Sequence, residues 1–91
     1  MYLHIGHDTM IDTGRIVAIL NKNLMDHSPE VRQMVHRLNS IGALQGDLAD
    51  AKTMILTDSG LVMSSISAAT LYKRAGKIAS EGSLAMWYTE I

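Results

Sequence analysis

Basic side chains are the residues of this sequence whose type and spacing best suit a binding chemistry. Lys73 and Arg74 are adjacent, Lys77 follows them, and residues 59–80 contain no Asp or Glu. Cations gathered in this way suit a surface that binds phosphate groups. The same pattern is typical of a solvated helix face whose cations complement the helix dipole. Because the whole chain carries a net charge of −1, affinity for nucleic acid must come from how its charge is distributed.

Two histidines near the start of the chain raise the question of a metal site. His4 and His7 lie close to Asp8, but two residues three apart on an extended chain point to opposite faces. Only a turn at Gly6 would bring them together. The chain has no cysteine, which excludes both a zinc–thiolate site and a disulfide framework. We therefore expect no metal and no other cofactor.

Three serines are the candidate nucleophiles, but their surroundings favour structural roles. Ser64, Ser65 and Ser67 lack the Gly-x-Ser-x-Gly pattern of a nucleophile elbow, and the sequence specifies no adjacent base. The run 75–77, Ala-Gly-Lys, lacks the upstream glycine of a Walker loop. A strand followed by a helix cap explains these hydroxyls, so we expect a protein that is not an enzyme.

Composition predicts one small domain that associates with copies of itself. The chain has 91 residues, of which 47% are hydrophobic, with seven Met and no Phe. So short and apolar a chain has more apolar surface than one core can hide, and self-association removes it from water. Neither a signal peptide nor a membrane-spanning apolar run is evident. We expect a cytoplasmic protein with a domain over residues 1–79 and a tail over 80–91.

The first half of the chain predicts two strands and a helix. Residues 1–6 alternate apolar and polar, residues 8–14 have turn chemistry, and residues 16–20 indicate a strand buried on both faces. Ser28 is a good N-cap and Pro29 suits the first helical position. An apolar stripe follows that N-cap, with Gly42 as terminator; its members are Val31, Met34, Val35, Leu38 and Ile41.

The second half predicts a hairpin and a second helix. Residues 53–57 and 61–66 indicate strands joined by the turn Asp58-Ser59-Gly60. Ser67 then indicates the N-cap of a helix running to about Ala79. The tail holds Trp87 and Tyr88, which could dock on the domain or on a neighbouring subunit. The fold class is α+β: a small, mostly antiparallel sheet with a central helix and a C-terminal helix.

Three segments together resemble the RemA/RemB family of bacterial extracellular matrix regulatory proteins. They are 3–6 (Leu-His-Ile-Gly), 14–19 (Gly-Arg-Ile-Val-Ala-Ile) and 54–59 (Met-Ile-Leu-Thr-Asp-Ser), with Val62 and Ser64 following. The opening Met-Tyr-x-His-x-Gly and the later Ser-x-x-Thr-Leu-x-Lys-Arg-Ala are closer to the RemB branch.

The resemblance implies a DNA-binding regulator of transcription for biofilm matrix genes, assembled as a ring-like homo-oligomer. Arg15 falls on the family's DNA-contacting arginine. The RemA branch has an arginine-rich contact loop before the 54–57 strand, where this chain keeps only Lys52, with Asp50 nearby. Lys73 and Arg74 match the end of the RemB pattern and complete the candidate DNA-binding residues. The alternative is an oligomeric protein–protein interaction module, with a related regulator as its partner, that does not bind DNA directly.

Overall fold

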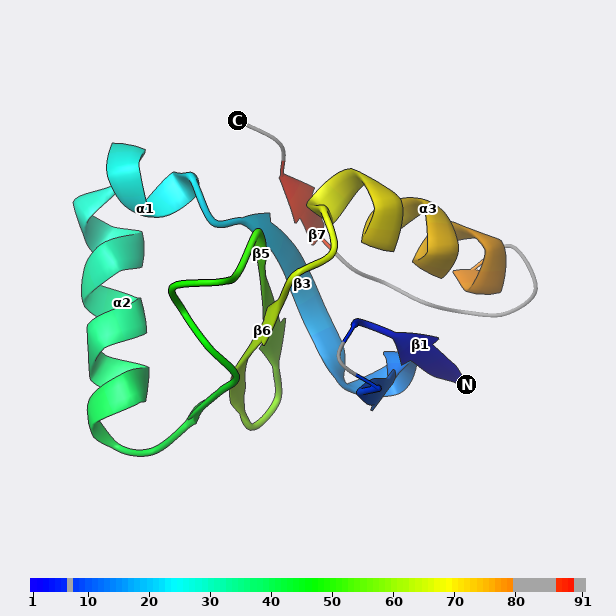
Figure 1. Ribbon diagram of the computed structural model, residues 1–91, viewed down its shortest axis with the longest axis horizontal. Coiled ribbons are helices and arrows are strands. Elements are labelled where there is room, and N and C mark those ends of the chain that lie inside the picture. Colours follow the sequence, from blue (N-terminus) through cyan, green and yellow to red (C-terminus); the bar gives the residue numbers. More distant parts are fainter. Residues whose placement is uncertain (7, 80–86, 90–91) are drawn as a thin grey trace.

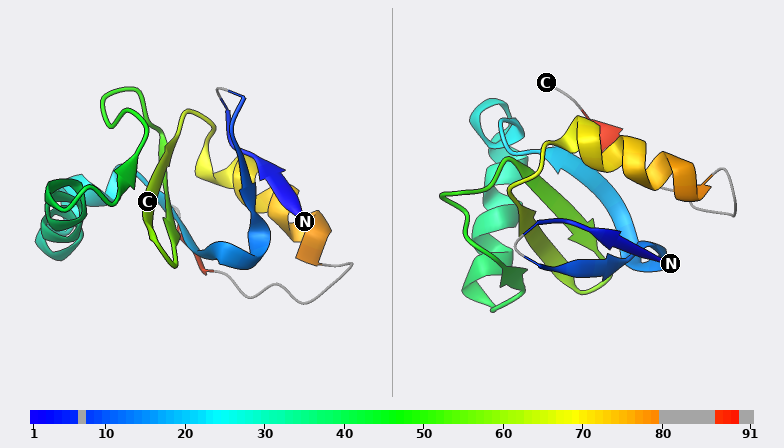
Figure 2. Two further views of the ribbon diagram at one scale, coloured as in Figure 1. Left: turned by 90° about the horizontal axis from the view of Figure 1, so that it is seen from below. Right: turned by 45° about the vertical axis from the view of Figure 1, so that its right-hand side comes forward.

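A five-stranded sheet lies between two layers, as Figures 1 and 2 show. The computed structural model describes residues 1–6, 8–79 and 87–89. In chain order the elements are β1 (Tyr2–His4), β2 (Met10–Asp12), the 3₁₀ turn η1 (Thr13–Arg15), β3 (Ile16–Asn21), α1 (Leu24–His27), α2 (Pro29–Ser40), β4 (Leu44–Gln45), β5 (Thr53–Thr57), β6 (Gly60–Ser64), α3 (Ala68–Ala79) and β7 (Trp87–Thr89).

The centre of the sheet is antiparallel and its edges are parallel. The strand order is β4-β6-β5-β3-β7, in which β5 runs antiparallel to both β3 and β6. At the edges, β4 pairs in parallel with β6 and β7 with β3. β1 and β2 form a separate antiparallel pair. This architecture confirms the predicted α+β class.

The two faces of the sheet bury two different apolar clusters. Successive strand residues point to opposite faces, so Met54 and Ile55 on β5 belong to different clusters. Ile55 packs in the layer that contains α3 and the β1–β2 pair, where Leu71 is fully buried. Met54 packs in the layer that contains α2, where Val35 is the buried helix residue. β5 thus contributes buried residues to both layers.

β3 departs from the predicted strand that is buried on both faces. Its register with β5 shifts between Ile16 and Ala18, which makes Val17 the extra residue of a β-bulge. Ile16 and Ile19, three residues apart, can therefore both join the cluster beneath α3. Val17 remains 46% exposed, so the prediction of full burial was wrong at this position.

Both long helices begin where their caps predict. The Ser28 side chain accepts a hydrogen bond from the Val31 amide, with Pro29 in the first turn of α2. Ser67 likewise accepts from the Thr70 amide at the start of α3. Ile41 was wrongly included in the apolar stripe, because α2 ends at Ser40 and Ile41 is 69% exposed.

Three strands, β2, β4 and β7, were not predicted from the sequence. Residues 8–14 were expected to form turns, whereas Met10–Asp12 forms β2 and pairs with β1. Within the tail, the backbone of Trp87–Thr89 pairs in parallel with Ala18–Leu20 of β3. β4 is two residues long and the other two strands are three residues long, which is too short to show a periodic pattern.

Candidate nucleic-acid interface

Arg15 lies at the junction between the 3₁₀ turn and β3. The Asp12 carboxylate accepts a hydrogen bond from the Gly14 amide at 3.0 Å, which closes the turn just before Arg15. The bulge at Val17 follows directly. Bulges commonly redirect neighbouring side chains. The turn and the bulge together fix where the Arg15 side chain leaves the sheet.

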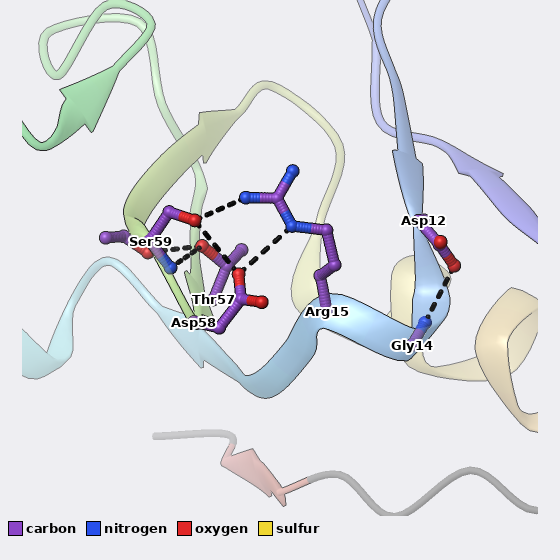
Figure 3. A network of polar contacts seen from close by, with 7 residues as sticks. Asp12, Gly14, Arg15, Thr57, Asp58 and Ser59 are labelled. Atoms are coloured by element: carbon purple, nitrogen blue, oxygen red, sulfur yellow. Dashed lines mark hydrogen bonds and ion pairs between the residues drawn. The ribbon is translucent and has the colours of Figure 1, made fainter.

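The guanidinium of Arg15 is bound to the β5–β6 turn. Its Nε donates to Oδ1 of Asp58 at 3.0 Å, and Nη2 donates to the Ser59 hydroxyl (Figure 3). Ser59 in turn donates to Asp58 Oδ1 at 3.0 Å. About half of each side chain in the Arg15–Asp58 ion pair is exposed, at 50% and 61%. The candidate DNA contact therefore carries its own counter-ion at the surface.

Thr57 and Gly60 hold the turn that presents Asp58 and Ser59. The Thr57 hydroxyl donates to the Gly60 carbonyl at 2.9 Å and accepts from the Ser59 amide at 3.1 Å. Gly60 has φ of +133°, and a Cβ there would lie 2.1 Å from the Ala43 carbonyl oxygen. Only glycine allows the chain to pass so close to Ala43 in this conformation.

The same network lowers the pKa of Asp58. The Arg15 hydrogen bond is the largest cause, followed by the bond from the Ser59 hydroxyl. Both stabilise the charged carboxylate. A depressed carboxyl pKa contributes stability at pH values above the pKa of the unfolded chain, and this is lost as pH falls through the folded value. At neutral pH Asp58 is therefore charged and competes with any phosphate for Arg15.

Lys52 lies just before β5, at the end of β5 and β6 that is opposite to the Asp58–Ser59 turn. Its amide donates to the Ser64 carbonyl at 2.8 Å, and its carbonyl accepts from the Lys22 amide at 3.1 Å. The Lys52 backbone is thus held from both sides, while its side chain is exposed. From Lys52 to Asp58 the extended chain covers about 20 Å at roughly 3.3 Å per residue. Arg15 and Lys52 can therefore contact only different phosphates.

Lys73 and Arg74 lie on α3 and are exposed. Arg74 Nη1 donates to the His4 carbonyl at 3.3 Å, which ties α3 to β1. Among the described residues, neither side chain bonds to Arg15 or Lys52. The structure thus distributes the four candidate residues over three places. Lys77 belongs to the same helix, at a position whose side chain the structure does not describe.

Of the other polar residues considered from the sequence, Ser64 and Ser67 have structural contacts. Ser64 donates to the Ile5 carbonyl at 2.6 Å, joining β6 to the end of β1, and Ser67 caps α3. His7 lies outside the described residues. Within the described ranges, no three acidic or histidine side chains could hold a metal. No helix in the described part has both the length and the apolarity to cross a membrane.

A comparison with family models identifies the family of this chain. The model for RemA-like proteins, described as extracellular matrix regulatory protein A-like, matches residues 2–75. The chain belongs to the RemA-like family. The match includes Arg15, Lys52, Lys73 and Arg74, and it ends before β7. A comparison with curated proteins gave no match to this chain. The RemB branch remains a prediction from the sequence.

Two pairings in this RemA-like chain were not predicted from the sequence. Asp58 and Ser59 were identified as turn residues, but their bonds to Arg15 join segments more than 40 residues apart. Lys22 was not identified from the sequence, whereas its amide donates to the Lys52 carbonyl. Only the register between β3 and β5 could have revealed both pairs, and no single segment encodes that register.

Proposed function

We propose that this RemA-like chain is a non-enzymatic, cytoplasmic regulator of matrix genes that binds DNA phosphates as a ring-like homo-oligomer. The observation that carries the proposal is Arg15, an exposed cation on a rigid turn in a chain of this family. Its guanidinium already binds a carboxylate oxygen and a hydroxyl. A phosphate diester offers the same kind of acceptor oxygens, so it can replace Asp58 as partner.

Multivalency supplies the affinity that one protomer lacks. Arg15 and Lys52 together neutralise about two phosphates, which gives a salt slope near −1.8 and about a twelvefold loss from 50 to 200 mM salt. Three protomers on one duplex triple that slope, and the same change of salt then costs about 10³-fold. Phosphate contacts position a protein without reading sequence, so promoter preference would come from DNA bendability.

Self-association is supported by the exposed apolar residues of the β1–β2 layer. Met1 and Tyr2 are each 66% exposed and Met10 is 53% exposed. Leu3 and Ile11 turn inward on the same two strands and are buried. Contact with another copy of the chain would remove this exposed apolar surface from water.

The second candidate function is an oligomeric module that binds a protein partner and no DNA. The Arg15–Asp58 ion pair favours it, because Asp58 already neutralises the candidate phosphate contact. Asp50, in the loop before Lys52, adds a further negative charge. The resemblance to the RemA branch implies an arginine-rich contact loop in this segment. This function predicts stable assembly without salt-dependent attraction to duplex DNA.

The deciding experiment compares Arg15→Ala with Arg37→Ala in a fluorescence-anisotropy titration of a bent, A·T-rich duplex. Arg37 is an exposed arginine on α2, so Arg37→Ala removes the same charge away from the β5–β6 turn. We expect Arg15→Ala to weaken binding about tenfold or more, since a charge-assisted bond is lost in every protomer, and Arg37→Ala to change it little. Sedimentation should show both variants still assembled. Equal affinities for the two variants would remove Arg15 from the interface.

A further inference from the structure

Two lysines face each other where β3 ends and β5 begins. Asn21 and Thr53 form the last pair of the antiparallel ladder, and Lys22 and Lys52 are the next residue on each side. The Lys22 amide donates to the Lys52 carbonyl at 3.1 Å, which joins the two residues directly. Directly opposed residues in such a ladder have Cβ atoms roughly 5 Å apart on one face. The two side chains therefore start side by side.

Both lysines line one large pocket at this end of the sheet. The pocket has a volume of about 950 Å³. Met25 and Leu48 supply apolar wall, and Ser67 at the start of α3 supplies a hydroxyl. A concave site of this size, with mixed walls and a few convergent charges, suits a small ligand or a group projecting from a larger one.

The electrostatics of the lysine pair call for an anion. Like charges directly opposite in a ladder are destabilising. Among the described residues, neither ammonium has a carboxylate within the 4.0 Å of an ion pair. A phosphate group has several acceptor oxygens and can accept from both ammoniums at once. We propose that Lys22 and Lys52 form a two-lysine site for one phosphate group at this pocket.

Two carboxylates limit which phosphates fit. Asp26 and Asp47 also line the pocket and repel additional negative charge. The site therefore suits a single phosphate rather than a di- or triphosphate. That phosphate is either a diester of the DNA backbone or a monoester on a small molecule. Only the DNA source rests on the proposed function; the site itself does not.

The first test uses inorganic phosphate and the full chain. Melting temperature is followed against phosphate concentration, with sodium chloride of equal ionic strength as reference, because a ligand that binds the folded state stabilises it by mass action. We expect phosphate to raise the melting temperature more than chloride does. In Lys22→Gln and Lys52→Gln the apparent affinity should fall about tenfold or more. Lys22→Arg keeps the charge and should keep the response.

Arg37→Gln is the matched control, because it removes an exposed cation from α2 that lies neither at the pocket nor on β3 or β5. It should respond to phosphate as the natural chain does. A phosphate effect no larger than that of chloride would overturn the proposal. So would a phosphate effect that Lys22→Gln and Arg37→Gln reduce equally.

The second arm identifies the source of the phosphate. Duplex affinity is measured for Lys22→Gln beside the natural chain. If the variant loses both duplex affinity and the phosphate response, the site holds a backbone phosphate. If it loses the phosphate response alone, the site holds a monoester, for which glycerol phosphate is the probe. A natural chain that binds phosphate but no duplex would refute the proposed function and still support the site.

Discussion

The two ends of the β3–β5 ladder are built alike in backbone and oppositely in charge. At one end the Asp58 amide donates to the Arg15 carbonyl at 3.2 Å, and at the other the Lys22 amide donates to the Lys52 carbonyl at 3.1 Å. The first end brings together a cation and an anion in an ion pair. The second brings together two cations, and both line a pocket.

The difference shows that a basic residue at a strand end is not by itself a binding site. Arg15 has an internal counter-ion, so an incoming phosphate must displace Asp58 and gains only the difference between the two partners. Lys22 and Lys52 have no such competitor among the described residues within ion-pair distance, so a phosphate relieves their repulsion. A phosphate at Arg15 must therefore exchange with Asp58, whereas a phosphate at Lys22 and Lys52 displaces no carboxylate of the described residues.

The largest expected effect comes from breaking the Arg15 end at Gly60. Gly60→Ala places a Cβ 2.1 Å from the Ala43 carbonyl oxygen at a φ of +133°. We expect a loss of about 3 kcal/mol in the free energy of unfolding, measured by urea denaturation. Gly76→Ala is the control, since its Cβ would meet nothing within 4 Å inside α3, and it should stabilise the chain by about 0.5–1 kcal/mol. Equal urea midpoints for Gly60→Ala and the natural chain would show that the turn tolerates a side chain.

A smaller effect comes from removing the counter-ion of Arg15. Asp58→Asn leaves the turn in place and frees the guanidinium, so duplex affinity at low salt should rise roughly fivefold. Glu30→Gln, on α2, changes the net charge by the same amount as Asp58→Asn and should have little effect on duplex affinity. Anisotropy titration measures both. A fall in affinity for Asp58→Asn would mean that Asp58 positions Arg15 for DNA rather than competing with it.

The smallest expected effect is at the lysine pair. Lys22→Gln removes a like-charge contact, so in low-salt chloride buffer its melting temperature should exceed that of the natural chain by about 1–3 °C. High salt screens the repulsion and should abolish the difference. Calorimetry at two salt concentrations measures this. A variant that melts lower at low salt would show that Lys22 has a stabilising partner of its own.

Elements with strong local signals were predicted correctly from the sequence. Ser28 and Pro29 identify the start of α2, and Ser67 identifies that of α3, because caps and helical stripes are encoded within a few residues. The β5–β6 hairpin follows from its turn residues in the same way. These predictions need no knowledge of distant parts of the chain.

The missed features depend on which strands lie side by side. The bulge at Val17 exists only relative to β5, and β7 is a strand only because β3 offers it an edge. The Arg15–Asp58 and Lys22–Lys52 pairs likewise follow from one register. A one-residue slip would change every such pair, so no local pattern could have predicted them.

The most direct test of the central claim is the salt dependence of duplex binding by the natural chain. A fluorescent duplex of about 60 base pairs is titrated at 50 and 200 mM salt. We predict that affinity falls by about 10³-fold, because several protomers each contact phosphates through Arg15 and Lys52. Absence of binding at 50 mM salt, or binding unchanged at 200 mM, would contradict it and point to a protein partner.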